Sequence, residues 1–224
     1  MIFLLNIDNY SPEVTKITYP LIKRYAHKIN ADIYKITERK FPGWPPVYEK
    51  LQIYELAQKF NNDWNIYIDS DTLIHPDMFD ITEQISKDTV VHNGQDMASH
   101  RWRYDRYFLR DGRNIGSCNW WAIASDWCVD LWKPLDDLTM EEAVARISPV
   151  VSELNGVTKA DHLIDDFTLS RNIARFGLKH TTNIKICEKL GYKDGNPFLW
   201  HIYNVPDADK PQKMMECLQI WGVK

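Results

Sequence analysis

The sequence has no long run of apolar side chains. None of its stretches approaches the roughly 20 consecutive apolar residues that span a bilayer, so we expect no transmembrane segment. Residues 1–5 are apolar, but no basic leader precedes them. The polar Asn6 and Asp8 also follow too soon for the hydrophobic region of a secretory signal peptide.

Cysteine is also scarce. The 224 residues include four cysteines, at positions 118, 128, 187 and 217, and no CxxC pair occurs among them. Their spacing does not match that of a metal site. We therefore expect a reduced protein that works in the cytoplasm, with a core large enough to need neither disulfides nor a structural metal.

A surplus of basic charge is missing as well. The chain has 27 Lys and Arg against 31 Asp and Glu, which gives a net charge of −4 at pH 7. Because non-specific binding to nucleic acid needs a basic face, we expect no nucleic-acid partner. With 44% hydrophobic residues, the composition is that of a globular protein and excludes intrinsic disorder, but it leaves the oligomeric state open.

No internal repeat, low-complexity segment or linker divides the chain, so we expect residues 1–224 to form one domain in two halves. In the first half, residues 1–93, apolar and periodic runs predict strands at 2–7, 32–37 and 65–69 and helices at 12–29 and 47–60. Strand–helix–strand connections of this length imply parallel pairing through right-handed crossovers. The predicted fold class is therefore α/β and Rossmann-like, with a mostly parallel central sheet flanked by helices.

The second half, residues 94–224, carries a looser pattern, and we expect mixed structure there. The pattern predicts strands at 119–125 and 198–203 and helices at 126–132, 138–148 and 161–176. Ser11 before Pro12 and Thr139 are typical residues for the start of a helix, and Gly177 is typical of a helix end.

Two carboxylates, Asp69 and Asp71, come directly after the strand at 65–69. Ligands of open α/β sheets bind beyond the carboxyl ends of the strands. If the backbone turns there, both carboxylates reach one cation, and hard oxygen ligands favour Mg²⁺ or Mn²⁺ with positions left open for substrate phosphates. The alternative interpretation is that both are turn residues before Pro76.

In this setting Asp69-Ser70-Asp71 resembles the DxD motif of glycosyltransferases with the GT-A fold. The wider spacing resembles the retaining branch that includes glycogenin-like and yeast α-mannosyl and α-galactosyl transferases. The resemblance implies that Asp69 and Asp71 hold a divalent cation, Mn²⁺ or Mg²⁺, on the diphosphate of a nucleotide-sugar. It also implies that residues 1–93 form the nucleotide-sugar-binding half and residues 94–224 the acceptor and C-terminal half.

Further positions extend the resemblance to both sides of the motif. His201 after Trp200 resembles the late histidine that supplies a third metal ligand, although it also suits a strand histidine with a satisfied hydrogen bond. Tyr48 and Lys50 open the helix before the DxD strand, where such enzymes often keep a basic residue for the donor. A solvated helix lysine is the alternative for Lys50. The family's His-x-x-Gly-x-x-Lys-Pro-Trp segment does not follow His201.

The sugar-binding residues are expected in the second half. Residues 114–119 resemble the family's Asn-x-Gly strand, so Asn114 and Gly116 are expected near the donor sugar, and Asn119 is a catalytic candidate. Asp165 and Asp166 resemble the family's acidic pair close to the transferred sugar. Adjacent residues on a helix point roughly 100° apart, so we expect one of the two to face the site. We favour Asp166, with Asp165 or Asn119 as alternatives.

The remaining donor contacts are expected from Asn6, Asp8, Ser70 and Trp120, in addition to Tyr48 and Lys50 already named. The sequence has nine Trp, eleven Tyr and eight Phe, and several of the tryptophans fall in loops or at strand ends near the proposed site. Flat aromatic faces of this kind suit stacking on a base or on the C–H face of a sugar.

Taken with the resemblance, these residues predict metal-dependent transfer of a hexose to an acceptor hydroxyl, with retention. The donor would be a UDP-sugar or, as a second choice, a GDP-sugar. A sugar nucleotidyltransferase is an alternative, but such enzymes normally carry a Gly-rich loop after the first strand, and residues 6–12 contain no glycine. A catalytically inactive carbohydrate- or nucleotide-binding protein of the same fold is the other alternative.

Overall fold

The computed structural model describes residues 1–93, 118–147, 160–193, 195–203 and 205–223. The strands are β1 (Ile2–Leu5), β2 (Ile33–Ile36), β3 (Trp64–Ile68), β4 (Thr72–Ile74), β5 (Thr89–Asn93), β6 (Cys118–Ser125), β7 (Lys179–Thr182) and β8 (Leu199–His201). The α-helices are α1 (Pro12–Lys28), α2 (Ile53–Phe60), α4 (Met140–Ile147), α5 (Ile164–Arg175), α6 (Asn183–Lys189) and α7 (Lys210–Ile220). Short 3₁₀ helices lie between them, including Pro46–Gln52, Asp126–Trp132 and Ala160–Leu163.

Six strands form the central sheet, in the order β2-β1-β3-β6-β5-β7. β1 pairs in parallel with β2 and β3, and β5 pairs in parallel with β7, whereas β6 lies antiparallel between β3 and β5. The predicted α/β class with a mostly parallel central sheet is therefore confirmed. A second, two-stranded antiparallel sheet joins β4 to β8 and brings the C-terminal part of the chain beside the end of β3.

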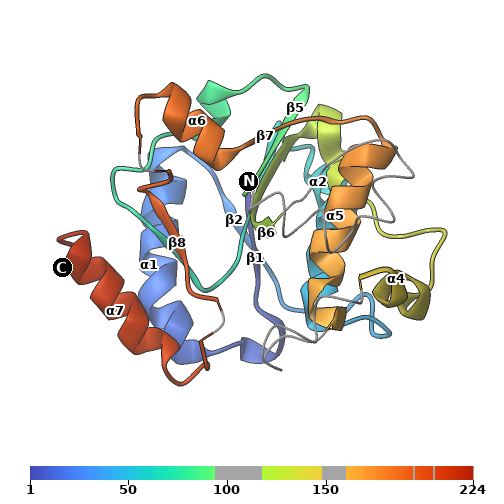
Figure 1. Ribbon diagram of the computed structural model, residues 1–224, viewed down its shortest axis with the longest axis horizontal. Helices are drawn as coiled ribbons and strands as arrows, with labels where there is room; N and C mark the ends of the chain where they lie inside the picture. Colours follow the sequence, from blue (N-terminus) through green and yellow to red (C-terminus); the bar gives the residue numbers. More distant parts are fainter. Residues whose placement is uncertain (94–117, 148–159, 194, 204, 224) are drawn as a thin grey trace.

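Helices cover both faces of the central sheet, with α1 and α6 on one side and α2, α4 and α5 on the other (Figure 1). Side chains of a strand point alternately to the two faces. In β3, Ile66 and Ile68 join the apolar core next to α1, while Tyr67 joins the core next to α2 and α5. Because both faces are buried, β1 is a continuous apolar run in the sequence and β3 is apolar except for Asn65.

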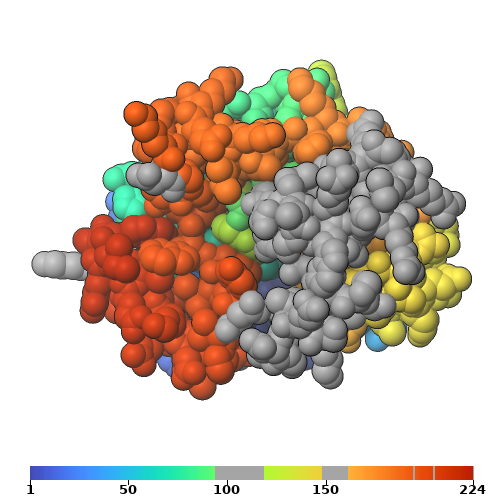
Figure 2. Space-filling model, viewed as in Figure 1, coloured from blue at the N-terminus to red at the C-terminus, as the bar shows by residue number. Residues whose placement is uncertain are grey.

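The C-terminal helix α7 packs against α1 on the outside of the molecule (Figure 1). Met214 of α7 joins Val14 of α1 and Leu73 of β4 in a third apolar cluster. In the space-filling view, C-terminal segments coloured orange and red form much of the face that is shown, and a small green patch from the middle of the chain is visible beside them (Figure 2). The packing of α7 fixes its first residue, Lys210, close to the end of β3.

The predicted helix at 47–60 differs from the structure in its first half. Residues Pro46–Gln52 form a 3₁₀ helix, and the α-helix begins only at Ile53. The buried Glu49 accepts hydrogen bonds from the backbone N–H groups of Lys40 and Phe41 and pairs with Arg39. These contacts tie the tighter helix to the preceding loop. The predicted helix at 126–132 is likewise a 3₁₀ helix.

The helix ends are partly as predicted. Pro12 opens α1, but Ser11 does not cap it, because the Ser11 backbone is left-handed (φ 34°) and its side chain makes no capping hydrogen bond. Thr139 does cap α4, since its hydroxyl accepts from the Glu142 N–H (3.2 Å) while the Glu142 carboxylate accepts from the Thr139 N–H (2.8 Å). Gly177, with φ 63°, follows α5.

Two further observations bear on the expectations from composition. Within the described ranges, no helix combines the length and the apolar character that crossing a bilayer requires. Cys128, Cys187 and Cys217 are free thiols in buried positions. The division of the chain into two functional halves stays a prediction.

The central position of β3 predicts a large stability effect at Ile66, which is 1% exposed. Replacing it in the variant Ile66→Ala removes buried methyl groups and leaves a cavity, so the free energy of unfolding should fall by about 2–5 kcal/mol. Urea unfolding at neutral pH measures the change. The matched control Ile220→Ala alters a side chain that is 73% exposed and should shift the same free energy by less than about 0.5 kcal/mol. Equal effects of the two variants would contradict the account of the core.

Candidate metal and nucleotide-sugar site

The turn after β3 presents two aspartates, Asp69 and Asp71, at the carboxyl edge of the sheet. The Asp69 N–H donates to the Trp120 carbonyl of β6 (2.8 Å). Ser70 anchors the turn from within, because its hydroxyl donates to the Leu5 carbonyl at the end of β1 (2.6 Å). The turn is thus attached to both neighbours of β3, and the two acids lie where ligands bind in open α/β sheets.

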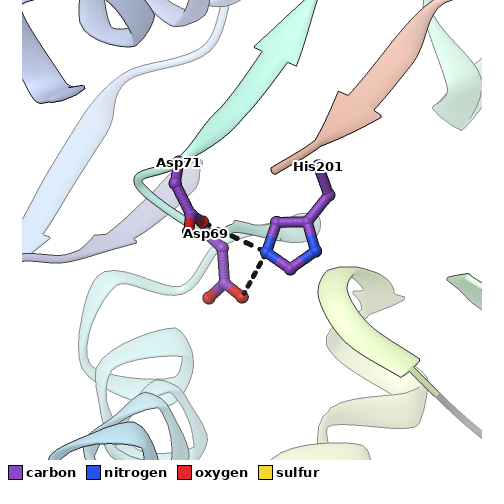
Figure 3. A group of neighbouring side chains, drawn as sticks. All are labelled: Asp69, Asp71 and His201. Atoms are coloured by element: carbon purple, nitrogen blue, oxygen red, sulfur yellow. Dashed lines mark ion pairs between the residues drawn. The ribbon is translucent and has the colours of Figure 1, made fainter. Parts of the chain in front are cut away.

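The pairing of β4 with β8 brings a histidine to these aspartates. His201 is the register partner of Thr72, which directly follows Asp71. The His201 Nε2 atom lies 3.1 Å from Asp71 Oδ1 and 3.7 Å from Asp69 Oδ2 (Figure 3). One ligand atom from each of the three side chains lies within 4.8 Å of the other two. The predicted triad of Asp69, Asp71 and His201 therefore exists as a cluster in the fold.

The cluster fits a divalent cation. Cis ligands of an octahedral ion with bonds of about 2.1 Å lie about 3 Å apart, which is close to the spacing between the His201 nitrogen and the two carboxylates. Two carboxylates and one imidazole are suitable ligands for Mn²⁺ or Mg²⁺. Three protein ligands leave other positions of an octahedral ion open to a substrate.

Aromatic rings pack against the His201 imidazole. The Trp120 ring stacks on it with a centroid distance of 5.0 Å and an interplanar angle of 17°, and the Tyr203 ring does so at 5.8 Å and 21°. Trp120 is buried, whereas Tyr203 is exposed. Trp120, which the sequence suggested as a donor-binding residue, is thus in contact with His201 of the Asp69, Asp71 and His201 cluster.

A lysine from the C-terminal helix completes the surroundings of Asp71. The Lys210 Nζ atom lies 2.7 Å from Asp71 Oδ2, 2.8 Å from the Tyr10 hydroxyl and 3.1 Å from Asp207 Oδ1. The sequence analysis did not predict this residue. The one available signal was the pair Lys210-Pro211, which resembles the Lys-Pro pair of the family segment. This pair lies further from His201 than it does from the histidine of that segment.

The contacts at Asp71 change the acidity of the groups involved. Burial by itself raises the pKa of the Asp71 carboxyl, but the hydrogen bonds and charges of His201 and Lys210 outweigh it and hold that pKa below its usual range. Burial and the nearby Asp71 carboxylate raise the pKa of the Tyr10 hydroxyl to about 12. At neutral pH, Asp71 is therefore an ionised carboxylate, and Tyr10 is a neutral hydrogen-bonding partner of Lys210.

The second lysine of the site, Lys50, is 1% exposed and belongs to the interior. Its Nζ atom lies 2.5 Å from Asp165 Oδ2 and 3.5 Å from Asp69 Oδ1, and the Tyr67 ring centroid is 4.5 Å away. Burial acts to lower the pKa of Lys50, but the carboxylates of Asp165 and Asp69 outweigh it and raise that pKa well above its usual value. The structure therefore places Lys50 in an ion-pair network and not on a solvated helix face.

The acidic pair at the start of α5 is connected to the same network through β6. The Asn119 backbone N–H donates to Asp166 Oδ1 (2.8 Å), and the Asn119 side-chain amide donates to the Asp165 carbonyl (3.0 Å). The Lys50 Nζ atom lies 3.5 Å from the Asn119 carbonyl. All three catalytic candidates thus lie next to Lys50 or to one another, with Asp165 joined directly to Lys50 and Asp166 to Asn119.

The other predicted substrate-binding residues lie in different surroundings. Asn6 and Asp8 follow β1 at the carboxyl edge of the sheet; the buried Asn6 side-chain oxygen has no hydrogen-bond partner among the described residues. Tyr48 is buried, accepts a hydrogen bond from the Leu135 N–H (2.8 Å) and stacks on Trp44, and none of its contacts in the described ranges reaches the metal cluster. The predicted donor-sugar residues Asn114 and Gly116 lie outside the described residues.

Comparison with known proteins supports the fold assignment. No protein-family model matches the sequence, and no curated protein matches it. Among solved structures, the fold is similar to that of a glycosyltransferase involved in the glycosylation of the major capsid of PBCV-1. The two chains share 11% identity with a TM-score of 0.53, over 96% of this chain and 98% of the other. The similarity supports the α/β fold and is consistent with a GT-A-like Rossmann fold, while the activity has to be argued from the site.

The buried network predicts a specific stability effect at Lys50. The variant Lys50→Met leaves the Asp165 carboxylate buried without its partner, so the free energy of unfolding should fall by about 3–5 kcal/mol. The double variant Lys50→Met with Asp165→Asn removes the unpaired charge and should recover most of that loss. Urea unfolding of both variants measures the difference. The matched control is Lys59→Met, which changes an exposed lysine and should leave the free energy of unfolding nearly unchanged. Failure of the double variant to recover stability would contradict the network.

Proposed function

We propose that this protein is a metal-dependent glycosyltransferase. It would move a hexose from a nucleoside-diphosphate sugar, in the first instance a UDP-sugar, to a hydroxyl of a carbohydrate or other acceptor. The observation that carries the proposal is the cluster of Asp69, Asp71 and His201, whose ligand atoms lie within 4.8 Å of one another at the carboxyl edge of a GT-A-like sheet. The similarity to a solved glycosyltransferase structure supports the same class.

Asp69, Asp71 and His201 would hold the cation, Mn²⁺ or Mg²⁺. When bound, this ion supplies Lewis-acid stabilisation of the negative charge that develops on the departing diphosphate. Lys210 is the chain's own contribution to the same task, because its ammonium group lies next to Asp71 and can donate to phosphate oxygens. The two carboxylates determine where the diphosphate lies, and the lysine adds positive charge on the side of α7.

The acids and amide next to Lys50 are suited to the sugar end of the donor. A sugar in transfer acquires oxocarbenium character, which a nearby carboxylate or amide oxygen stabilises. Such oxygens lie in buried positions beside the ion-pair network of Lys50 and belong to Asp166, Asp165 and Asn119. The Lys50 ammonium group, 2.5 Å from Asp165 Oδ2, would hold that carboxylate in place, so its position is preorganised.

On the basis of the sequence resemblance, we also propose that the transferred group is a hexose and that the configuration at its anomeric carbon is retained. We propose that the leaving phosphate takes the proton of the acceptor hydroxyl, in which case no separate base is required. The free thiols support a reducing compartment, and we propose that the enzyme works in the cytoplasm. NMR of the freshly formed product, which distinguishes the α and β anomers, tests retention directly.

The proposed site predicts that metal and nucleotide bind together. Mn²⁺ with UDP should raise the melting temperature by about 5 °C or more at concentrations about a hundredfold above the dissociation constants, because ligands that bind only the folded state stabilise it. EDTA should reverse the increase. A thermal-shift titration measures it, and a screen of UDP- and GDP-sugars in the same assay identifies the donor. No stabilisation by any nucleoside diphosphate with Mn²⁺ or Mg²⁺ would contradict the proposal.

A second test addresses turnover. The variant Asp71→Asn keeps the shape of the side chain but removes a charged ligand, so metal-dependent hydrolysis or transfer of the donor sugar should fall by about 10- to 100-fold or more. The matched control is Asp77→Asn, because the Asp77 side chain is 81% exposed and lies outside the cluster. Circular dichroism checks that both variants are folded. Full activity in Asp71→Asn, or equal losses in the two variants, would contradict the assignment.

A further inference from the structure

Both oxygens of the Asp71 carboxylate are engaged in the structure by side chains. Oδ1 faces His201 Nε2 at 3.1 Å, and Oδ2 faces the Lys210 ammonium group at 2.7 Å. The Lys210 and Asp71 side chains are 10% and 11% exposed, so the pair is largely shielded from water. A divalent cation that binds Asp71 therefore has to share this carboxylate with a positive charge that is already in contact with it.

The other carboxylate of the triad is in a similar position. Asp69 Oδ1 lies 3.5 Å from the Lys50 ammonium group, and Lys50 is held by Asp165 as well. Each of the two carboxylates proposed as metal ligands thus has a lysine beside it. These lysines reduce the attraction of a divalent ion to the two carboxylates. At short range in a poorly solvated site, the repulsion between each lysine and the ion offsets part of that attraction.

The two lysines differ in how firmly they are placed. Lys50 is enclosed and paired with Asp165, so moving its charge away would leave the buried Asp165 carboxylate without this partner. Lys210 is the first residue of α7 and has two further partners, the Tyr10 hydroxyl at 2.8 Å and Asp207 Oδ1 at 3.1 Å. Asp207 is exposed, so this side of Lys210 is open toward solvent. Lys210 can therefore turn away from Asp71 without losing every partner.

We propose that Lys210 competes with the metal for Asp71 in the free protein, so that the divalent cation binds tightly only together with a nucleoside diphosphate. The diphosphate would supply negative charge to both the metal ion and the Lys210 ammonium group. Lys210 can then donate to the diphosphate in place of Asp71. The inference rests on the proposed function, since it concerns the same metal cluster. It adds an order of events to that function: the nucleotide and the metal enter as a pair, and the free protein stays largely metal-free.

The proposal predicts effects of opposite sign from a single substitution. In Lys210→Met, the competing charge is gone, so Mn²⁺ alone should bind about tenfold more tightly or better than it does to the original protein. The same variant lacks a donor for the phosphates, so the factor by which UDP increases Mn²⁺ affinity should shrink by a similar amount. General damage to the site would weaken both binding events and cannot produce this pair of results.

The experiment measures Mn²⁺ binding by electron paramagnetic resonance of the free ion, with and without UDP, at constant pH and ionic strength. Lys210→Arg keeps the charge and should keep Mn²⁺ binding weak. Lys213→Met is the matched control, because Lys213 lies on the same helix and pairs with Glu216 at the surface, and it should leave both affinities unchanged. If Lys210→Met does not fold, Lys210→Gln tests the same point with an uncharged hydrogen-bond donor.

The outcomes separate this inference from the proposed function. Tighter binding of Mn²⁺ alone, together with a weaker effect of UDP, supports the competition. If the original protein binds Mn²⁺ tightly with UDP but the uncharged variants bind Mn²⁺ alone no better, the competition is refuted and the metal site stands. If the original protein binds Mn²⁺ neither alone nor with UDP, the proposed function fails, and this inference fails with it.

Discussion

The structure around the carboxyl edge of the sheet depends on the pairing of buried negative charge with lysine. Asp71 is buried and Asp69 is partly buried at the end of a strand that is enclosed on both faces, and a carboxylate withdrawn from water in this way needs a positive partner or a metal. Lys50 reaches Asp69 from the segment before α2, and Lys210 reaches Asp71 from α7. The site is therefore assembled from parts of the chain that lie far apart in sequence and are brought together by ion pairs.

This pairing also explains why separate elements pack as they do. Lys50 links the DxD turn to Asp165 at the start of α5, so the region next to α2 and α5 is tied to the carboxyl edge of β3. Lys210 ties α7 to the same turn, and the contacts of α7 with α1 complete that side. The short β4–β8 sheet then aligns His201 with Thr72, directly beside Asp71. Lys50, Lys210 and His201 thus all contact the aspartates of the turn between β3 and β4.

Much of the first half of the fold could be predicted from the sequence, because its signals are local. β1 is an uninterrupted apolar run, β3 is apolar except for Asn65, and α1 shows a helical period after Pro12. The position of Asp69 and Asp71 follows from the end of β3. His201 could be proposed because the family resemblance expects a late histidine after the DxD motif. The predicted triad is therefore found as a cluster in the structure.

The parts that could not be predicted depend on contacts distant in sequence. β4 has only three residues and becomes a strand through its pairing with β8, while β5 and β7 gain their conformation from neighbours in the sheet. Lys210 stands at an unexpected distance from His201, and only the packing of α7 on α1 brings it to Asp71. The burial of Lys50 and the 3₁₀ form of residues Pro46–Gln52 likewise follow from tertiary contacts, which a helical period does not reveal.

The similarity to a solved glycosyltransferase places the fold, whereas the activity depends on what the cluster binds. The most direct measurement is an anomalous difference map, recorded near the manganese absorption edge, from crystals grown with Mn²⁺ and UDP. Our account predicts one strong peak within bonding distance of Asp69, Asp71 and His201, with the diphosphate of UDP beside it and near Lys210. Bound UDP without a peak at these three residues, or a manganese ion at a different place, would contradict it.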